Sequence, residues 1–183
     1  MPEEAVWAGF FDPPAVLAAL GLRDDDTVLD LGSGYGTFAL PAAAHTCRNV
    51  YALDIEPGLV ALLAARAAAA GLDNLHVRHC DVLTSAVADF DVPPATLALA
   101  FNILHVEAPV ALLRTLRGLL GPDGRLAAIH WRSDIETPRG PPLAIRPRAA
   151  DIAAWAATAG FGDTCEIDLG AAAPWHYGLV MEC

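Results

Sequence analysis

The sequence has 183 residues, of which 55% are hydrophobic and 18% are charged, and its formal net charge is -11. This composition predicts one globular domain that can bury its own core. All eleven basic residues are arginines, so a Walker-type lysine and a lysine Schiff base are excluded. Affinity for nucleic acid comes mainly from clustered basic residues. The acid excess therefore predicts a small-molecule partner and no nucleic acid.

The four cysteines stand at positions 47, 80, 165 and 183, without a C-x-x-C pair. They predict reduced thiols in a cytoplasmic protein, and neither a zinc ribbon nor a redox dithiol. His76, His79 and Cys80 cannot all converge on a metal, because neighbouring side chains of a strand point to opposite faces. An acidic N-terminus and an alanine run interrupted by Arg66 predict no targeting segment and no membrane span. We expect no metal and a monomer or homodimer.

The first predicted elements are a helix, a strand and a second helix. Asp12 followed by two prolines has the form of an N-cap with proline in the first turn, and this helix should end at Gly21. We interpret the acidic run 24–26 as a solvated turn without a role and the apolar run 27–31 as a buried strand. A helix is expected from Thr37, with Pro41 in its first turn.

The alternation of strands and helices continues along the chain. Strands are expected at 49–54, 74–79, 96–101 and 125–131, helices at 57–70 and from position 109, and a turn at 121–124. After an irregular segment at 132–148 come a helix at 151–160 and two strands within 161–169 and 176–182. Strands without polar alternation need cover on both faces, so we predict a doubly wound α/β domain with helices on both faces.

A glycine-rich turn, Asp30–Gly36 (DLGSGYG), joins the first strand to its helix. Glycines permit positive φ and a close approach between backbone and ligand. The spacing is G-x-G-x-G, since position 37 is threonine, whereas a dinucleotide fold carries G-x-G-x-x-G. Asp30 would repel a pyrophosphate and attract an ammonium group. The turn therefore predicts a ligand with an amino-acid end.

Two further carboxylates stand at the ends of the next predicted strands. Asp54 is the last residue of the second strand. In this position its carboxylate can accept hydrogen bonds from both hydroxyls of a ribose. Asp81 follows the third strand, at a level suited to an adenine amino group. Together with Asp30 they favour an adenosine-type ligand.

With these residues the chain resembles a class I S-adenosylmethionine-dependent methyltransferase. VLDLGSGYG, YALDIEP, HCDVL, FNILH and LLGPDGRLAAIHW match the first to fifth motifs of that family in order. Within it, the chain is most similar to the small quinone-biosynthesis-like group (methyltransferase type 11), which acts on small molecules. The resemblance implies a Rossmann-like sheet of seven mostly parallel strands with an antiparallel last strand. It also implies one domain over 1–183, with a leading helix at 1–22, a cofactor-binding core at 23–131, and a substrate-side loop, helix and last two strands at 132–183.

The resemblance further implies that S-adenosylmethionine lies across the carboxyl ends of the first strands and that S-adenosylhomocysteine is the product. Asp54 would hold the ribose and Asp81 the adenine, Cys80 would be a neutral wall of the adenine site, and Phe101 and Asn102 would lie beside the methionine portion. The expected cofactor contacts are Asp30, Gly32, Ser33, Gly34, Gly36, Asp54, Ile55, Cys80, Asp81, Val82, Phe101 and Asn102.

Acceptor-side residues are expected after the fourth and fifth strands. His105 and His130 are candidate bases for a hydroxyl or acidic carbon, although each could instead satisfy local carbonyl groups. The segment 132–148 holds four of the arginines, so Trp131, Arg132, Arg139 and Arg146 are candidate substrate contacts, or else partners of surface carboxylates. The aromatic residues Trp7, Phe10 and Phe11 would cover the cofactor or anchor the leading helix.

Two other readings of the motifs remain open. A nicotinamide oxidoreductase would also use Asp54, but the third glycine position and a Tyr-x-x-x-Lys pair are missing. Every motif expected to contact the cofactor is also compatible with a non-catalytic S-adenosylmethionine-binding protein. The fourth strand ends in FNIL, without the Pro-Pro-Tyr/Phe signature of methylation at planar amino groups. The acceptor atom, whether O, C, N or S, stays undetermined at this point.

Overall fold

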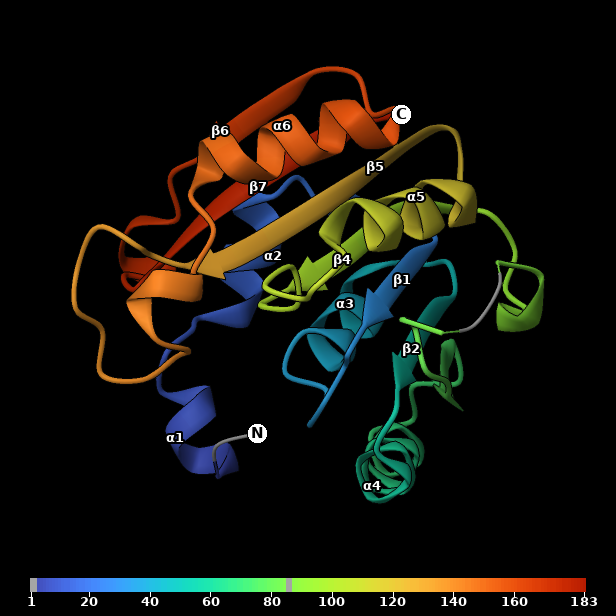
Figure 1. Cartoon of the computed structure of the whole chain (residues 1–183). Coiled ribbons are helices and arrows are strands. Elements are labelled where there is room, and N and C mark those ends of the chain that lie inside the picture. Colours follow the sequence, from blue (N-terminus) through green and yellow to red (C-terminus); the bar gives the residue numbers. More distant parts are fainter. Residues whose placement is uncertain (1–2, 85–86) are drawn as a thin grey trace.

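Seven strands form one sheet in the computed structural model, which describes residues 3–84 and 87–183 except the side chains of 88 and 89 (Figure 1). Their order is β3-β2-β1-β4-β5-β7-β6. The first five strands pair in parallel, and β7 is antiparallel to both of its neighbours. This confirms the predicted fold class. The strands are β1 Val28–Leu31, β2 Val50–Asp54, β3 Leu75–His79, β4 Ala95–Phe101, β5 Leu120–Trp131, β6 Thr164–Ile167 and β7 His176–Glu182.

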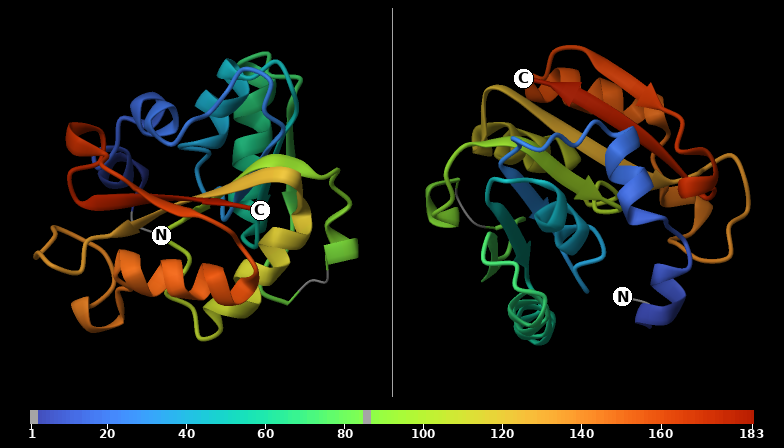
Figure 2. Two further views of the ribbon diagram at one scale, coloured as in Figure 1. Left: turned by 90° about the horizontal axis from the view of Figure 1, so that it is seen from above. Right: turned by 180° about the vertical axis from the view of Figure 1, so that it is seen from behind.

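Helices cover both faces of the sheet, as Figure 2 shows from above and from behind. Successive strand residues point to opposite sides: Val28 packs with the residues of α2, α3 and α4, whereas Leu29 packs with those of α5 and α6. Each face therefore has its own apolar layer. The α-helices are α1 Glu4–Ala8, α2 Pro13–Ala19, α3 Ala39–His45, α4 Pro57–Ala69, α5 Pro109–Leu119 and α6 Ala149–Ala159, and the short 3-10 helices are Val87–Phe90, Leu143–Ile145 and Gly170–Ala172.

The leading helix forms where its capping residues predict it. The Asp12 side chain accepts a hydrogen bond from the Ala15 N–H at 3.2 Å, and Pro13 and Pro14 fill the first positions of α2. A further short helix, α1, precedes it and was not predicted. None of its residues is buried, so it carries no apolar periodicity by which the sequence could have indicated it.

The start of β5 differs from its prediction. Residues 121–124 were expected as a turn, but β5 begins at Leu120, which pairs with Ala95 of β4. The register then shifts, so that Leu97 pairs with Arg125. The glycines and the proline of this segment are accommodated in an irregularity of the ladder, where extra residues are tolerated without ending the strand.

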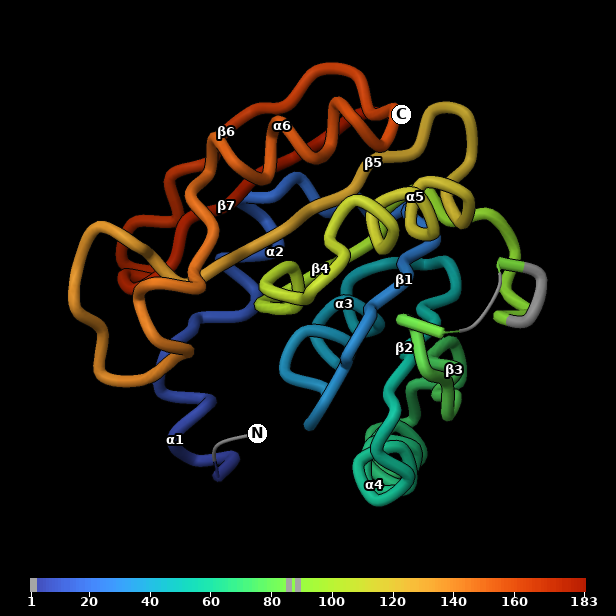
Figure 3. The backbone as a smooth tube through the Cα atoms, in the orientation of Figure 1, coloured from blue at the N-terminus to red at the C-terminus, as the bar shows by residue number. Residues whose placement is uncertain are grey.

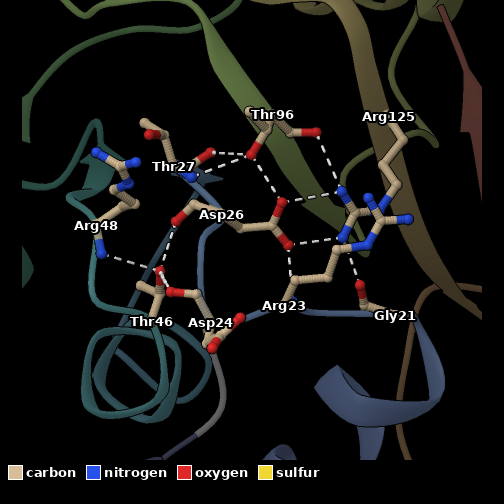
Figure 4. Close-up of polar contacts among 9 residues, drawn as sticks. All are labelled: Gly21, Arg23, Asp24, Asp26, Thr27, Thr46, Arg48, Thr96 and Arg125. Atoms are coloured by element: carbon tan, nitrogen blue, oxygen red, sulfur yellow. Dashed lines mark hydrogen bonds and ion pairs between the residues drawn. The ribbon is translucent and has the colours of Figure 1, made fainter.

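The acidic run before β1 is not simply a solvated turn, because Asp26 is only 2% exposed (Figure 4). Its carboxylate pairs with Arg125 at 2.7 Å and accepts a hydrogen bond from the Thr96 hydroxyl at 2.7 Å. Arg125 also donates to the carbonyl of Gly21, at the end of α2. Asp26 therefore joins the amino ends of β1, β4 and β5 to the leading helix, and our assignment of no role to it was wrong.

The strand order places a topological switch point between β1 and β4. The tube in Figure 3 follows the chain outward from β1 through β2 to β3 and then back to β4, on the other side of β1. The loops after β1 and β4 consequently leave in opposite directions at the carboxyl edge of the sheet. In open α/β sheets ligands bind in the crevice at this point.

Candidate functional site

A cavity of about 1230 Å³ opens at the carboxyl ends of β1, β2, β4 and β5. It has the volume of a site for a cofactor with a small second ligand. Most of the residues that the sequence singled out lie on its wall, although they come from five separate chain segments. These are Asp30, Gly32, Ser33, Gly34, Asp54, Ile55, Cys80, Asp81, Val82, Phe101, Asn102, His105, Trp131 and Arg139.

The three glycines of the turn after β1 adopt the positive φ that the sequence predicts. Gly32, Gly34 and Gly36 have φ of 68°, 54° and 81°, in the left-handed region that favours glycine. Gly36 lies outside the cavity lining, and a Cβ there would stand 2.2 Å from the Leu63 side chain of α4. The first two glycines thus face the cavity, and the third allows the turn to pack against α4.

Asp54 holds the glycine turn against the end of β2. One carboxylate oxygen accepts a hydrogen bond from the Gly34 N–H at 2.7 Å, and the other accepts one from the Glu56 N–H at 2.9 Å. Each oxygen retains further acceptor capacity toward the cavity. The predicted binding carboxylate therefore also fixes the backbone that surrounds the ligand site.

Asp30 is enclosed at the end of β1 and is 3% exposed. Burial, together with the neighbouring charge of Asp54, raises the pKa of this carboxyl to about 7, against the lowering effect of a hydrogen bond from the Ala39 N–H. A carboxyl with this pKa is partly protonated at neutral pH. A cationic ligand in the cavity would favour its ionised form.

The residues predicted to meet an adenine line the cavity beside β3. Asp81 accepts hydrogen bonds from the Leu83 N–H at 2.9 Å and from the Thr84 hydroxyl at 2.8 Å. The N–H of Leu83 and the hydroxyl of Thr84 lower the pKa of Asp81, so the carboxylate is ionised and remains an acceptor. Cys80 and Val82 flank it on the same wall.

Asn102 occupies a strained position after β4. Its φ is 57°, an uncommon value for a residue other than glycine. Its Oδ1 accepts a hydrogen bond from the Trp131 N–H at 3.1 Å, whereas its Nδ2 is buried without a hydrogen-bond partner among the described residues. Asn102 therefore presents an unused donor at a place where the backbone is held in an unfavourable conformation.

The two candidate bases occupy different environments. His105 lines the cavity and is partly exposed, whereas His130 is fully buried in β5 and lies outside the lining. Nδ1 of His105 and Nε2 of His130 are 3.3 Å apart. Burial lowers the pKa of His105, and it lowers the pKa of His130 to about 4. Only His105 can meet a ligand directly.

The arginine-rich segment contributes less to the cavity than predicted. Arg139 lines it, but Arg132 pairs with Asp134 at 2.6 Å and lies in a separate cavity. Arg146 is 9% exposed and donates to the carbonyls of Pro141, Arg132 and Arg139 at 2.7, 2.8 and 3.3 Å. Its role is to hold this segment together, because its donors are directed at backbone oxygens.

The aromatic residues near the N-terminus divide between the two roles considered for them. Trp7 lines the cavity, whereas Phe10 is 8% exposed and packs on Trp131 with ring centroids 5.2 Å apart. Helix α1 is held over α4 by an ion pair between Glu4 and Arg66 at 2.5 Å. Figure 1 shows α1 and the 132–148 segment on the same side of the molecule, at the end of β5.

Several cavity residues were not predicted. Tyr35, Thr37 and Phe38 lie within or just after the glycine turn, so their proximity to it could have indicated them. Ile103, Val106, Gly140 and Pro141 come from loops without a recognisable pattern. Among residues 3–84 and 87–183, no three metal-ligating side chains gather into a metal site. In the same part of the chain, no helix is long and apolar enough to cross a membrane.

Comparison with known proteins places this geometry in a family. A family model described as a methyltransferase domain matches residues 28–124, more than half of the chain. A solved S-adenosylmethionine-dependent methyltransferase from Aquifex aeolicus has the same fold, with a TM-score of 0.80 at 22% identity, covering 98% of this chain and 93% of its own.

Relatives in sequence are longer proteins. An uncharacterized protein of Mycobacterium tuberculosis is 30% identical over 128 residues, which are 69% of this chain and 43% of that protein. A probable ribosomal RNA small subunit methyltransferase A of Methanothermobacter thermautotrophicus is 29% identical over 119 residues, covering 65% of this chain and 38% of the relative. The chain thus spans less than half the length of these relatives. It belongs to the methyltransferase-domain family and adopts the Rossmann-like class I fold of S-adenosylmethionine-dependent methyltransferases.

Proposed function

We propose that this domain transfers a methyl group from S-adenosylmethionine to a small-molecule acceptor and releases S-adenosylhomocysteine. The observation that carries the proposal is the convergence of the glycine turn with Asp30, Asp54 and Asp81 on one cavity. S-adenosylmethionine presents an ammonium group, two ribose hydroxyls and an adenine amino group, all of which donate hydrogen bonds. Three carboxylates match these donors, and they would repel the pyrophosphate of a dinucleotide.

The residues present fit this cofactor. Asp30 would accept from the ammonium group, Asp54 from the ribose hydroxyls and Asp81 from the adenine amino group. The unpartnered Nδ2 of Asn102 is a donor for a carboxylate or an acceptor oxygen near the methionine portion. When bound, the cofactor supplies a methyl group on a positively charged sulfur. Ile55, Cys80 and Val82 would flank the adenosine.

The acceptor would lie at the other end of the cavity. Trp7, Ile103, Val106 and Trp131 are apolar parts of the cavity wall, and Arg139 is a cationic side chain of the same lining. This wall suits a compact organic molecule. The net charge of -11 opposes a long nucleic-acid footprint, even though one relative is named as a ribosomal RNA methyltransferase.

Alignment of donor and acceptor is the main catalytic requirement of a methyl transfer. Holding the reacting atoms in line about 3 to 3.5 Å apart can lower the barrier by on the order of 7 to 11 kcal/mol. The side chains of α1, β4, β5 and the 132–148 segment would supply this alignment. A covalent intermediate with the protein is not required.

Calorimetric titration with S-adenosylmethionine, S-adenosylhomocysteine, NAD and NADP tests the proposal. We expect micromolar binding of the first two alone, and binding of a nicotinamide cofactor instead would overturn the assignment. Asp54→Ala should lower affinity for S-adenosylhomocysteine at least about 10-fold, because a buried acceptor is lost. Asp25→Ala, an exposed acid at the opposite edge of the sheet, is the matched control and should bind normally. Unchanged binding by Asp54→Ala would refute the ribose assignment.

A further inference from the structure

The contact between His105 and His130 determines where the protons of both rings lie. His130 has two polar neighbours: its Nδ1 is 3.4 Å from the carbonyl oxygen of Trp131, and its Nε2 is 3.3 Å from Nδ1 of His105. A carbonyl oxygen can only accept a hydrogen bond, so Nδ1 of His130 carries a proton. This ring is neutral at physiological pH, because burial lowers its pKa to about 4. Nε2 of His130 therefore has no proton and can only accept a hydrogen bond, from Nδ1 of His105.

The tautomer of His130 also fixes the tautomer of His105. Since Nε2 of His130 accepts, the proton between the rings belongs to Nδ1 of His105. A neutral imidazole carries only one N–H, so Nε2 of His105 has a free lone pair. His105 lines the cavity, and burial lowers its pKa, which keeps the ring in this neutral form. The fully buried His130 thus prepares a proton acceptor on a residue that a ligand can reach.

Asn102, on the same cavity wall, carries a buried hydrogen-bond donor without a partner among the described residues. The Asn102 amide is oriented by the Trp131 N–H, which donates to its Oδ1, and its Nδ2 has no partner among the described residues. A hydroxyl group needs both of these functions: an acceptor for its proton and a donor for its oxygen. An amine that attacks through its lone pair has no use for the donor.

We propose that His105 removes the proton of an acceptor hydroxyl, a phenol or an enol, through Nε2, and that His130 is a positioning residue that fixes the tautomer of His105. This inference rests on the proposed function. The acceptor oxygen forms its bond to the methyl carbon with loss of the carbon–sulfur bond, and that electron pair remains on sulfur. The hydroxyl proton stays on His105, which can return it to solvent because its ring is partly exposed.

The surrounding charges are consistent with a neutral pair. Burial, then the charges of His105 and Arg146, lower the pKa of His130, and burial keeps His176 neutral with a pKa of about 3. Arg139, Asp30 and Asp54 line the cavity that His105 enters. No carboxylate forms a hydrogen bond with either ring among the described residues, so the tautomers depend on the Trp131 carbonyl and on the contact between the two histidines.

Long-range 1H–15N spectra of the histidine rings test the tautomer directly in the unliganded protein. We expect His105 in the Nδ1–H form, whereas a free neutral imidazole prefers Nε2–H. His130→Phe removes the acceptor and should return His105 to the Nε2–H form. His130→Gln offers an amide oxygen in its place and should restore Nδ1–H. An Nε2–H form in the unmodified protein, or the same form in all three proteins, would overturn the inference.

Matched phenols and anilines test the acceptor class with the same proteins. Methylation of a phenol should fall about 100-fold in kcat for His105→Ala and about 10-fold for His130→Phe, with recovery in His130→Gln and unchanged affinity for S-adenosylhomocysteine. Turnover of anilines alone, or of neither class, would refute the hydroxyl assignment. Failure of S-adenosylhomocysteine to bind would refute the proposed function instead, and the ring spectra would still decide the tautomer.

Discussion

At the Asp30 side chain, burial opposes the charge that a ligand site needs. Asp30 lies beside Asp54 and accepts a hydrogen bond from the N–H of Ala39, the first residue of α3, and its pKa is about 7. Ionisation of a carboxyl in this environment is unfavourable as long as no cation is bound beside it. An ammonium group in the cavity would offset the cost of ionising Asp30, so this carboxylate would favour the binding of a cation.

Asp30→Asn should raise stability and lower affinity together. The folded pKa lies above the unfolded value near 3.8, so the folded protein keeps a proton that the unfolded chain loses between about pH 4 and 7. Its unfolding free energy therefore falls with rising pH by about 1.4 kcal/mol per unit in this window. Asparagine has no such dependence. Denaturant unfolding at pH 5 and 7.5 should show that the advantage of the variant over the unmodified protein is larger at the higher pH.

The same variant should bind S-adenosylmethionine at least about 10-fold more weakly in calorimetry, because the partner of the ammonium group is gone. Asp25→Asn, which changes an exposed acid, is the control. A stability difference that does not change with pH would mean that Asp30 is ionised at pH 5 in the folded protein.

At the scale of the elements, the buried pair of Asp26 and Arg125 joins strands and a helix that are distant in sequence. Arg125 contacts both carboxylate oxygens, at 2.7 and 3.0 Å, and both side chains are almost fully buried. Burial raises the pKa of Asp26, but the hydrogen bonds from Arg125 and Thr96 outweigh it and hold the pKa below its usual value. The pair lies at the amino ends of the parallel strands, away from the ligand cavity.

Asp26→Ala should destabilise the protein by about 3 to 5 kcal/mol, because the Arg125 cation is left buried without a partner. Equilibrium denaturation measures this loss. The double variant Asp26→Ala with Arg125→Met should lose less than the single variant, since neither charge remains. An equal loss in both would indicate that packing, and not the unpaired charge, carries the effect. The folded fraction of either variant should bind S-adenosylhomocysteine normally.

At the scale of the whole molecule, His176 is a packing centre between segments from both ends of the chain. Its ring lies 4.1 Å from that of Trp131 and 4.6 Å from that of Phe11, measured between centroids. Neither ring nitrogen has a hydrogen-bond partner among the described residues, and burial lowers the pKa to about 3. The His176 ring therefore packs like an aromatic side chain, and burial favours its neutral form.

His176→Phe should make the protein more resistant to acid. The folded pKa of His176 lies below the unfolded value near 6.5, so its contribution to stability is lost as the pH falls from 6.5 toward 3. The advantage of the variant in unfolding free energy should grow by about 1.4 kcal/mol for each unit between pH 6 and 4. Denaturation at pH 4, 5, 6 and 8 measures it, with the exposed His45→Gln as control. A constant difference would indicate a group that titrates normally.

Sequence patterns singled out most of the polar residues that line the main cavity. Residues at or just after the carboxyl ends of β1, β2, β3 and β4 line one cavity, because parallel strands bring their carboxyl ends to the same edge of a sheet. The division into one domain with a cofactor core and a substrate-side segment stays a prediction, in which residues 1, 2, 85 and 86 lie outside the described part. Membership of the quinone-biosynthesis-like group also stays a prediction.

Local signals thus determined the order of the strands and helices, the glycine turn and the carboxylates at the strand ends, because each depends on residues close together in the chain. Contacts between distant segments were decided only by the tertiary structure. Asp26 is buried by Arg125 from 99 residues away, and Arg146 is turned toward backbone carbonyls. His130 lies behind His105, where burial sets its charge. Pattern identifies which groups are present, and packing decides which of them meet water, a ligand or each other.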